Sequence, residues 1–134
     1  MREKTIMLKL PSNPRNVSLI GSFVDRIAER YKIKPDKYGD ILISLTEAVN
    51  NAIIHGNRKD ENKTVQIQLH KRNNSIAIRV SDEGRGFDYT KLPDPTCPEN
   101  ILKIGGRGVF LMQQLSDELR FHNNGSTVEI HFKL

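Results

Sequence analysis

The sequence predicts an α+β fold, a two-layer sandwich in which helices cover one face of a mostly antiparallel, mixed sheet. Three observations support this prediction. The strand-like segments come in pairs joined by tight turns, and the helix-like segments each carry one apolar stripe. The elements follow the order β, α, α, β, β, a long irregular stretch, α, β, β. Because hairpins pair neighbouring strands antiparallel, the helices are expected to gather on one face of the sheet.

The first half of the chain is predicted to be a strand followed by two helices. Apolar residues alternate with polar ones over Thr5–Leu10, which is typical of a half-buried strand. Asn13 is a suitable N-cap for a helix over 14–31, because a proline follows it at the first helical position. Pro35 opens a second helix. Gly56 is expected to close that helix near the usual C′ position.

The second half is predicted to contain two hairpins separated by a helix. Strands over 65–69 and 76–80 alternate apolar and polar residues on either side of an Asn-Asn turn. A third helix runs from Val109 to about Leu115. A closing hairpin pairs Leu119–His122 with Thr127–Phe132 around a second Asn-rich turn.

Length and composition indicate one globular domain. The chain has 134 residues, 37% hydrophobic and 28% charged, and we expect a single domain over residues 1–134. No apolar run approaches the roughly 20 residues that cross a membrane, and the start lacks the apolar region of a signal peptide. We therefore expect no membrane binding. The only cysteine, Cys97, cannot form an internal disulfide, which suggests a reducing compartment, and we expect a cytoplasmic protein. The spacing of Cys97 and the four histidines predicts no zinc site.

The net charge of +5 is distributed unevenly. Residues 1–72 carry 14 Lys and Arg against eight Asp and Glu, whereas residues 73–134 carry seven against eight. A basic half could bind nucleic acid or an acidic protein. The basic residues are scattered, with few aromatic residues of the kind that stack on bases, so a solvated surface without direct nucleic-acid contact is the preferred interpretation.

The chain is organised around the stretch Leu42–Asn57, which reads as one amphipathic helix with a broad apolar face. Glu47 and Asn51 are four residues apart, so they lie one turn apart on the opposite flank, next to Ile43 and Ile54. A carboxylate and an amide framed by isoleucines suit a pocket wall, where the anion acts as a base and the amide oxygen meets a hard cation. The alternative is a surface pair on a core helix.

Two glycine-rich segments follow. Asp82–Phe87 (DEGRGF) comes at the end of a buried strand, where Gly84 and Gly86 allow close backbone approach and Asp82 can accept a hydrogen bond from an exocyclic amine such as that of adenine. The alternative is an ordinary glycine turn. Tyr89–Lys103 contains three prolines, is long for a connection, and is predicted to form a lid.

The second glycine-rich segment, Gly105–Gly108 (GGRG), stands at a helix N-terminus. Free backbone N–H groups and the positive helix end favour a phosphate there, and Arg107 could add charge. The segment lacks the Lys-Ser/Thr ending of a Walker A loop and does not follow a strand within a βαβ unit. A glycine cluster of this kind does not define a site by itself.

Taken in order, these motifs resemble the GHKL superfamily, whose members share the Bergerat ATP-binding fold. They include DNA gyrase B subunits, sensor histidine kinases and anti-sigma-factor serine kinases. The N box of the superfamily is similar to Glu47–Ala52 (EAVNNA), its first glycine box to Asp82–Phe87, and its second to Gly106–Gly108. The resemblance covers the whole chain.

Within the superfamily, Glu47–Gly56 and Gly105–Met112 look most like the bacterial anti-sigma-factor serine kinases of sporulation and general stress. Sensor histidine kinases carry a helical dimerisation domain and gyrase-like ATPases carry further domains, and we find neither pattern in this sequence. One departure is Ser126, where many relatives have a threonine near the adenine. Its hydroxyl is kept, whereas Arg107 stands where relatives vary.

The resemblance implies a function and a set of residue roles. The chain would be an ATP-dependent serine/threonine protein kinase that acts as an anti-sigma-factor-like switch in transcription regulation. The implied roles are as follows: Glu47 as general base, Asn51 as Mg²⁺ ligand, Asp82 as reader of the adenine amine, Gly84 and Gly86 for backbone approach to the nucleotide, Gly106 and Gly108 as N–H donors to phosphate, and Arg107 and Ser126 beside the nucleotide.

The resemblance also implies partners. The phospho-acceptor would be a serine or threonine of a small anti-anti-sigma (STAS-type) protein, and the second partner a sigma factor or a similar regulator. Homodimers are common in the resembled family, so a homodimer is a possible assembly. The alternative function is a non-catalytic, nucleotide-gated module that sequesters a regulator. A basic nucleic-acid binder is a third class, and it predicts DNA binding that depends steeply on salt.

Overall fold

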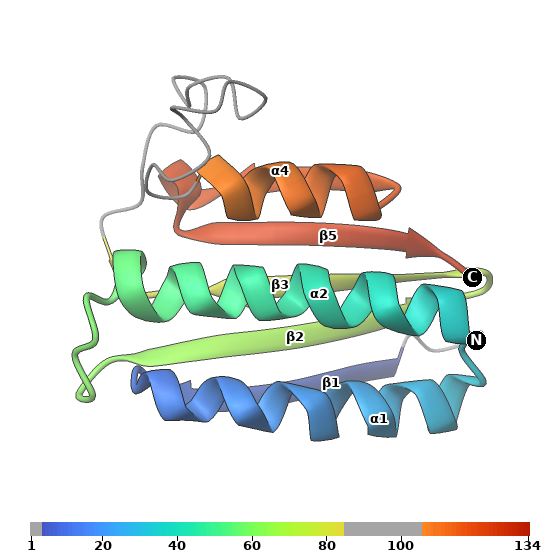
Figure 1. Ribbon diagram of the computed structural model, residues 1–134, viewed down its shortest axis with the longest axis horizontal. Helices are drawn as coiled ribbons and strands as arrows, with labels where there is room; N and C mark the ends of the chain where they lie inside the picture. Colours follow the sequence, from blue (N-terminus) through green and yellow to red (C-terminus); the bar gives the residue numbers. More distant parts are fainter. Residues whose placement is uncertain (1–3, 85–105) are drawn as a thin grey trace.

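The structure, a computed structural model, describes residues 4–84 and 106–134. It is a two-layer sandwich in which three α-helices lie side by side on one face of a five-stranded sheet (Figure 1). The predicted α+β class and the one-sided helical layer are confirmed. Every pairing among the described strands is antiparallel, so the sheet is more uniform than the mixed sheet that was predicted.

The strands occur where the sequence predicts them, in the spatial order β1-β2-β3-β5-β4. Alternate apolar residues fall on the helical side, as at the cross-strand pairs Ile6 with Leu69 and Ile78 with Ile130. Both predicted hairpins are present. The bounds are Lys4–Pro11 for β1, Thr64–Arg72 for β2, Ser75–Ser81 for β3, Glu118–His122 for β4 and Thr127–Lys133 for β5.

The helices also follow the prediction, with small shifts at their ends. The predicted first helix begins as a 3₁₀ turn, and the side chain of Asn13 caps that turn by accepting a hydrogen bond from the backbone N–H of Arg15. The third helix begins at Gly106, earlier than predicted. The bounds are Pro14–Ser18 for the 3₁₀ turn, Leu19–Tyr31 for α1, Pro35–Asn51 for α2, Ala52–Gly56 for a π-helical turn that continues α2, and Gly106–Leu115 for α4.

As predicted, the helix closes at Gly56, where the π turn that continues α2 ends, although Gly56 itself is not left-handed. Among the described residues, left-handed backbone after α2 occurs at Arg58 and Lys59, with φ of 52° and 59°. Gly56 is needed for a different reason, because a Cβ atom there would collide with the carboxyl group of Asp82. The end of α2 therefore touches the end of β3, and this contact positions the site described below.

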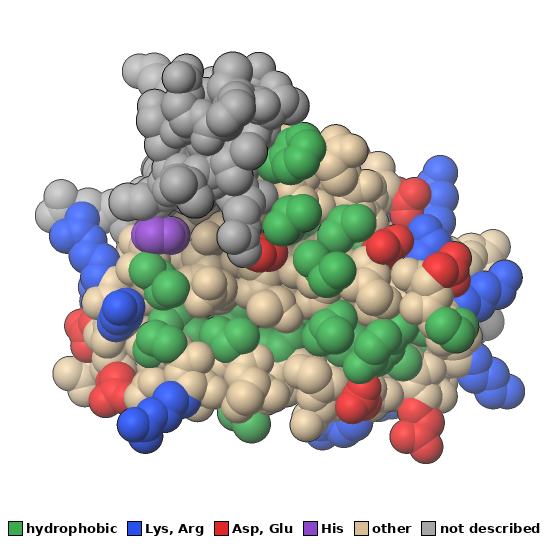
Figure 2. Space-filling view, in the orientation of Figure 1, with side chains coloured by type: hydrophobic (Ala, Val, Ile, Leu, Met, Phe, Trp, Pro, Cys, Tyr) green, Lys and Arg blue, Asp and Glu red, His purple; other side chains and the backbone are tan. Residues whose placement is uncertain are grey.

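The core lies between the sheet and the helices, with α2 at its centre (Figure 1). None of the helices in the described parts of the chain is long and apolar enough to cross a membrane. Some apolar side chains of the helical layer stay outside the core, including Leu19 and Ile43 at 47% and 45% exposure, and hydrophobic side chains form a band along this face (Figure 2). The largest fully buried side chains include Phe23, Ile41, Leu45, Ile53, Ile67, Ile78 and Phe132.

The opposite face of the sheet carries a charged cluster centred on Glu129 in β5. Arg79 Nε donates to Glu129 Oε1 at 2.6 Å, and His131 Nε2 lies 2.8 Å from Oε2. His122 Nε2 lies 3.6 Å from the same Oε2. Burial alone would raise the pKa of Glu129, but the hydrogen bonds from His131 and Arg79 and their charges lower it from 4.5 to about 2.

This depressed pKa predicts a pH dependence of stability. Because the folded state holds the Glu129 carboxylate ionised, its stabilisation is present above pH 4.5 and is lost as the pH falls from 4.5 towards 2. Urea unfolding between pH 7 and pH 2.5 should show a loss of up to roughly 3 kcal/mol from this group.

Glu129→Gln should be less stable than wild type at pH 7 and should lose less stability in acid. Glu118→Gln, which changes a more exposed carboxylate on the neighbouring strand, is the matched control and should follow the wild-type curve. Parallel pH curves for wild type and Glu129→Gln would contradict this account of the cluster.

Candidate functional site

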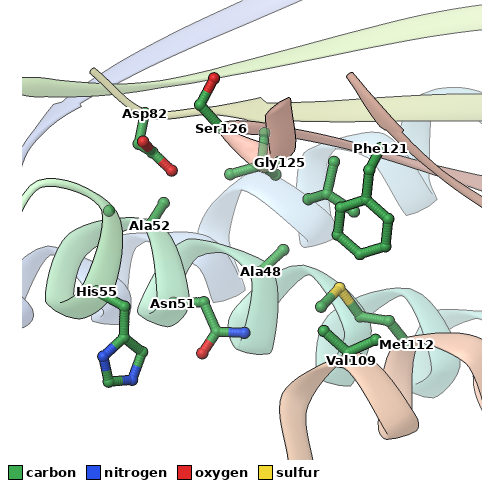
Figure 3. Close-up of a pocket in the computed structure, with 13 residues that line it drawn as sticks. Ala48, Asn51, Ala52, His55, Asp82, Val109, Met112, Phe121, Gly125 and Ser126 are labelled. Atoms are coloured by element: carbon green, nitrogen blue, oxygen red, sulfur yellow. The ribbon is translucent and has the colours of Figure 1, made fainter. Parts of the chain in front are cut away.

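A cavity of about 120 Å³ opens between α2, α4 and the strand ends of the sheet (Figure 3). Its walls are largely apolar, with polar groups at the two ends. Apolar cavities with a few convergent polar groups are typical of small-molecule sites. The lining residues are Ala48, Asn51, Ala52, His55, Gly56, Val80, Asp82, Val109, Met112, Phe121, Gly125, Ser126 and Val128.

The middle of the cavity is a slot between α2 and the sheet. Ala48 and Ala52 point from α2 toward the sheet, and their small side chains leave the slot open (Figure 3). Val109, Met112 and Phe121 supply the apolar wall beside α4. A planar, weakly polar ring system such as a nucleobase suits this shape.

Asp82 stands at one end of the slot, directly after β3, and its carboxylate points into the cavity (Figure 3). Its Oδ1 accepts a hydrogen bond from the Gly84 N–H at 2.8 Å, and its own N–H donates to the Ser126 carbonyl at 2.9 Å. Burial raises the pKa of Asp82 above its usual value, while the Gly84 N–H and the charge of Lys63 partly offset that rise. A half-buried carboxylate without a close cationic partner in the described structure can accept a hydrogen bond from a ligand.

Two glycines let this end of the cavity form. A Cβ atom at Gly84 would collide with the carbonyl oxygen of Gly56, just as one at Gly56 would collide with Asp82. Glycine is therefore needed at position 84 because this residue contacts the π turn of α2. Its predicted approach to a nucleotide stays a prediction.

Asn51 lines the cavity away from Asp82, and Glu47 and Gly108, which do not line it, lie close to Asn51. A Cβ atom at Gly108 would lie 2.7 Å from Asn51 Nδ2 and 3.2 Å from Glu47 Oε2, so α4 approaches both side chains closely. Gly108 belongs to the first turn of α4, where backbone N–H groups have no partner inside the helix and the helix dipole is positive. This region therefore combines a carboxylate, an amide and an anion-attracting helix start.

The remaining predicted residues are placed as follows. Gly106 and Arg107 begin α4, although the side chain of Arg107 is not among those described. Gly86 and the predicted lid Tyr89–Lys103 lie outside the described residues. Ser126 lines the cavity, but its hydroxyl donates to the carbonyl of Asn123 at 2.9 Å.

Sequence reasoning missed several lining residues. Ile43 and Ile54, which suggested a pocket wall beside Glu47, do not line the cavity, whereas Ala48 and Ala52 do. A signal was present, since Ala48, Ala52 and Gly56 repeat small side chains every four residues on one flank of α2. His55 extends the flank of Glu47 and Asn51 by another turn, and burial lowers the pKa of its imidazole. No local pattern singles out Met112 or Phe121.

Comparison with known proteins identifies the class. A family model described as a histidine kinase-like ATPase domain matches residues 10–132. Serine-protein kinase RsbW of Bacillus subtilis (strain 168) is 32% identical over 92% of this chain and 81% of its own length. RsbW of Bacillus licheniformis is 31% identical over 93% and 82% of the two chains, and RsbW of Listeria innocua is 28% identical over 92% and 83%.

The chain therefore belongs to the histidine kinase-like ATPase family and, within it, to the RsbW group of serine-protein kinases. ATP is accordingly its nucleotide. The resemblance drawn from the three sequence motifs is confirmed.

A solved structure supports the fold independently. The RsbU and RsbW domains of Rv1364c from Mycobacterium tuberculosis superpose with a TM-score of 0.68 at 15% identity, over 98% of this chain. This chain spans about a third (32%) of that longer chain, so the likeness concerns the fold alone.

The contact between Gly56 and Asp82 yields a second prediction. Gly56→Ala should push the Asp82 carboxyl group out of place and weaken ATP binding by at least tenfold, measured by calorimetry, because the new methyl group has no space. Gly39→Ala is the matched control in the same helix, where a Cβ atom meets nothing within 4 Å.

Gly39→Ala should stabilise α2 by about 0.5–1 kcal/mol and leave ATP affinity unchanged. Equal ATP affinities for wild type and Gly56→Ala would show that the contact does not control the site.

Proposed function

We propose that this protein is an ATP-dependent serine/threonine protein kinase that acts as an anti-sigma-factor-like switch in transcription regulation. The observation that carries the proposal is one cavity with two chemically distinct ends. Asp82 provides a hydrogen-bond acceptor at one end and Asn51 lines the other, while Glu47 lies beside Asn51 against the start of α4 without lining the cavity. The names of its relatives support the same reaction class.

In this proposal the adenine occupies the apolar slot and its exocyclic amine donates to the Asp82 carboxylate. The phosphates then lie toward the first turn of α4, where Gly106 and Gly108 offer backbone N–H groups without a side chain in the way. Gly86, Arg107 and Ser126 are proposed to flank the nucleotide, as the family motifs imply.

We propose that Asn51 would hold a magnesium ion. The donor set fits, because Asn51 supplies a neutral amide beside the helix start where phosphates are expected. Within residues 4–84 and 106–134, no group of three or more His, Cys, Asp or Glu could hold a metal alone. Mg²⁺ commonly takes most of its ligands from phosphates and water, and when bound it neutralises phosphate charge during transfer.

Glu47 is proposed as the general base. It lies one helical turn before Asn51, close to Gly108 in the first turn of α4. Its carboxylate would take the proton from the attacking hydroxyl of the acceptor serine or threonine. The hydroxyl oxygen forms a bond to the γ-phosphorus, while the bond from that phosphorus to the ADP oxygen breaks.

The proposed phospho-acceptor is a small anti-anti-sigma (STAS-type) protein, and the second partner is a sigma factor or a similar regulator. We also propose a cytoplasmic location, where such regulators act, and a homodimer as in the resembled family. Phosphosite mapping after pull-down with and without Mg-ATP tests the partner assignment. A host partner that binds in the presence of ATP without ever becoming phosphorylated would favour the non-catalytic, nucleotide-gated module.

The assignment of Asp82 predicts nucleotide selectivity. Wild type should bind ATP more tightly than GTP, because guanine presents a carbonyl where adenine presents its amine, and two acceptors repel. Asp82→Asn should reduce the ratio of ATP to GTP affinity by about tenfold or more, the cost of a hydrogen bond to a charged group. Calorimetric titration with both nucleotides measures this ratio. Equal affinities in the wild type would remove the basis for the assignment.

Glu47 and Asn51 should respond differently to substitution. Asn51→Ala should weaken Mg-ATP binding and lose phosphotransfer with it, because octahedral Mg²⁺ tolerates little misplacement of ligands. Glu47→Gln keeps size and removes the basic group, so nucleotide should still bind while phosphotransfer falls by about 10²–10⁴-fold. If Glu47→Gln loses nucleotide affinity as severely as Asn51→Ala does, the carboxylate is a metal ligand or a structural group instead.

A further inference from the structure

Asn57, directly after the π turn of α2, is a polar side chain almost completely removed from solvent, with 1% of its surface exposed. Its Oδ1 accepts a hydrogen bond from the backbone N–H of Glu83 at 2.7 Å. Its Nδ2 donates to Ser12 Oγ at 2.8 Å and to the Thr64 carbonyl at 3.0 Å. Both N–H groups and the oxygen of the amide are thus engaged inside the protein.

These bonds join four segments that are distant in the sequence. Asn57 holds the end of α2, Ser12 follows β1, Thr64 begins β2 and Glu83 follows β3. The side chain of Glu83 belongs to the same network, because its Oε2 accepts a hydrogen bond from the Thr64 N–H at 2.5 Å. Glu83 is therefore held at two points. Its backbone N–H bonds to Asn57 at the end of α2, and its carboxylate bonds to Thr64 at the start of β2.

The residue that precedes Glu83 is Asp82. Asp82 touches Gly56, the neighbour of Asn57, and Gly84 touches the carbonyl oxygen of Gly56. Two consecutive residues at the end of α2 thus hold three consecutive residues after β3, by close contact at Gly56 and by a hydrogen bond at Asn57. The separation between α2 and the Asp82 carboxylate depends on this pair of contacts.

We infer that Asn57 is a positioning residue for nucleotide recognition: by anchoring the Glu83 N–H to the end of α2, it sets the place of Asp82 in the cavity and so the preference for adenine. Only an amide meets the requirement, because the same side chain must accept from Glu83 and donate to Ser12 and Thr64. The inference rests on the proposed role of Asp82. It adds a residue that touches neither nucleotide nor metal.

The test compares ATP and GTP affinities, by calorimetry, in the full chain. Asn57→Ala removes the acceptor for Glu83 and should lower the ratio of ATP to GTP affinity by roughly tenfold, as expected for Asp82→Asn, because the Asp82 carboxylate is then no longer held in place. If Asn57→Ala does not fold, Asn57→Ser replaces it, since its shorter side chain does not span the distance to Glu83. Asn57→Asp keeps an acceptor for Glu83 and should keep the ratio within about twofold of wild type.

Ser12→Ala is the matched control. Ser12 is fully buried and belongs to the same network, but its removal leaves the bond between Asn57 and Glu83 in place. It should lower the melting temperature while keeping the wild-type ratio of affinities. A general loss of packing would instead lower the ratio in both variants.

A double variant separates this inference from the proposal on which it rests. If Asn57 acts through Asp82, then Asn57→Ala combined with Asp82→Asn should have the same ratio as Asp82→Asn alone. A wild-type ratio in Asn57→Ala, a ratio in Asn57→Asp as low as in Asn57→Ala, or independent effects in the double variant would overturn the inference. A wild-type ratio in Asp82→Asn would overturn the proposed role of Asp82, and the inference with it.

Discussion

The close approach of the end of α2 to the end of β3 is the constraint on which the site depends. At Gly56 the backbone comes so near to Asp82 and Gly84 that no side chain fits on either glycine. The helical layer and the sheet therefore meet at this corner. Farther along α2, the small side chains of Ala48 and Ala52 belong to the core and also line the cavity. The cavity lies beside this contact, where the small side chains of α2 face the sheet.

The same helix supplies both kinds of surface that a nucleotide requires. Residues repeated every four positions lie above one another along a helix, so α2 presents two parallel stripes. One stripe consists of the small residues Ala48, Ala52 and Gly56 and faces the sheet. The adjacent stripe carries Glu47, Asn51 and His55. α4 completes the polar end, because its first turn reaches Asn51 and Glu47 through Gly108. A single rigid element thus sets the distance between the base-binding slot and the phosphate-binding end.

The pKa values of two carboxylates, Glu129 and Asp82, shift in opposite directions because their surroundings differ. Glu129 is surrounded by Arg79, His131 and His122, and these partners lower the pKa of Glu129 in spite of its burial. Asp82 is half-buried, and among the described residues its side chain accepts a hydrogen bond from the backbone N–H of Gly84, while burial raises the pKa of Asp82. The first carboxylate is satisfied within the fold. The second retains capacity for a ligand, which is a property that functional sites share.

The sequence by itself determined the elements, their order and the three motifs. Strand alternation, helical stripes, the Asn13 cap and the Asn-rich hairpin turns depend on neighbouring residues, so they are readable locally. Tertiary structure decided which residues meet. Gly56 touches Asp82, Phe121 reaches the cavity from β4, and Asn57 bonds to residues 45 and 26 positions away. Such contacts leave no periodic trace in a single sequence, because they arise only when the folded chain brings distant segments together.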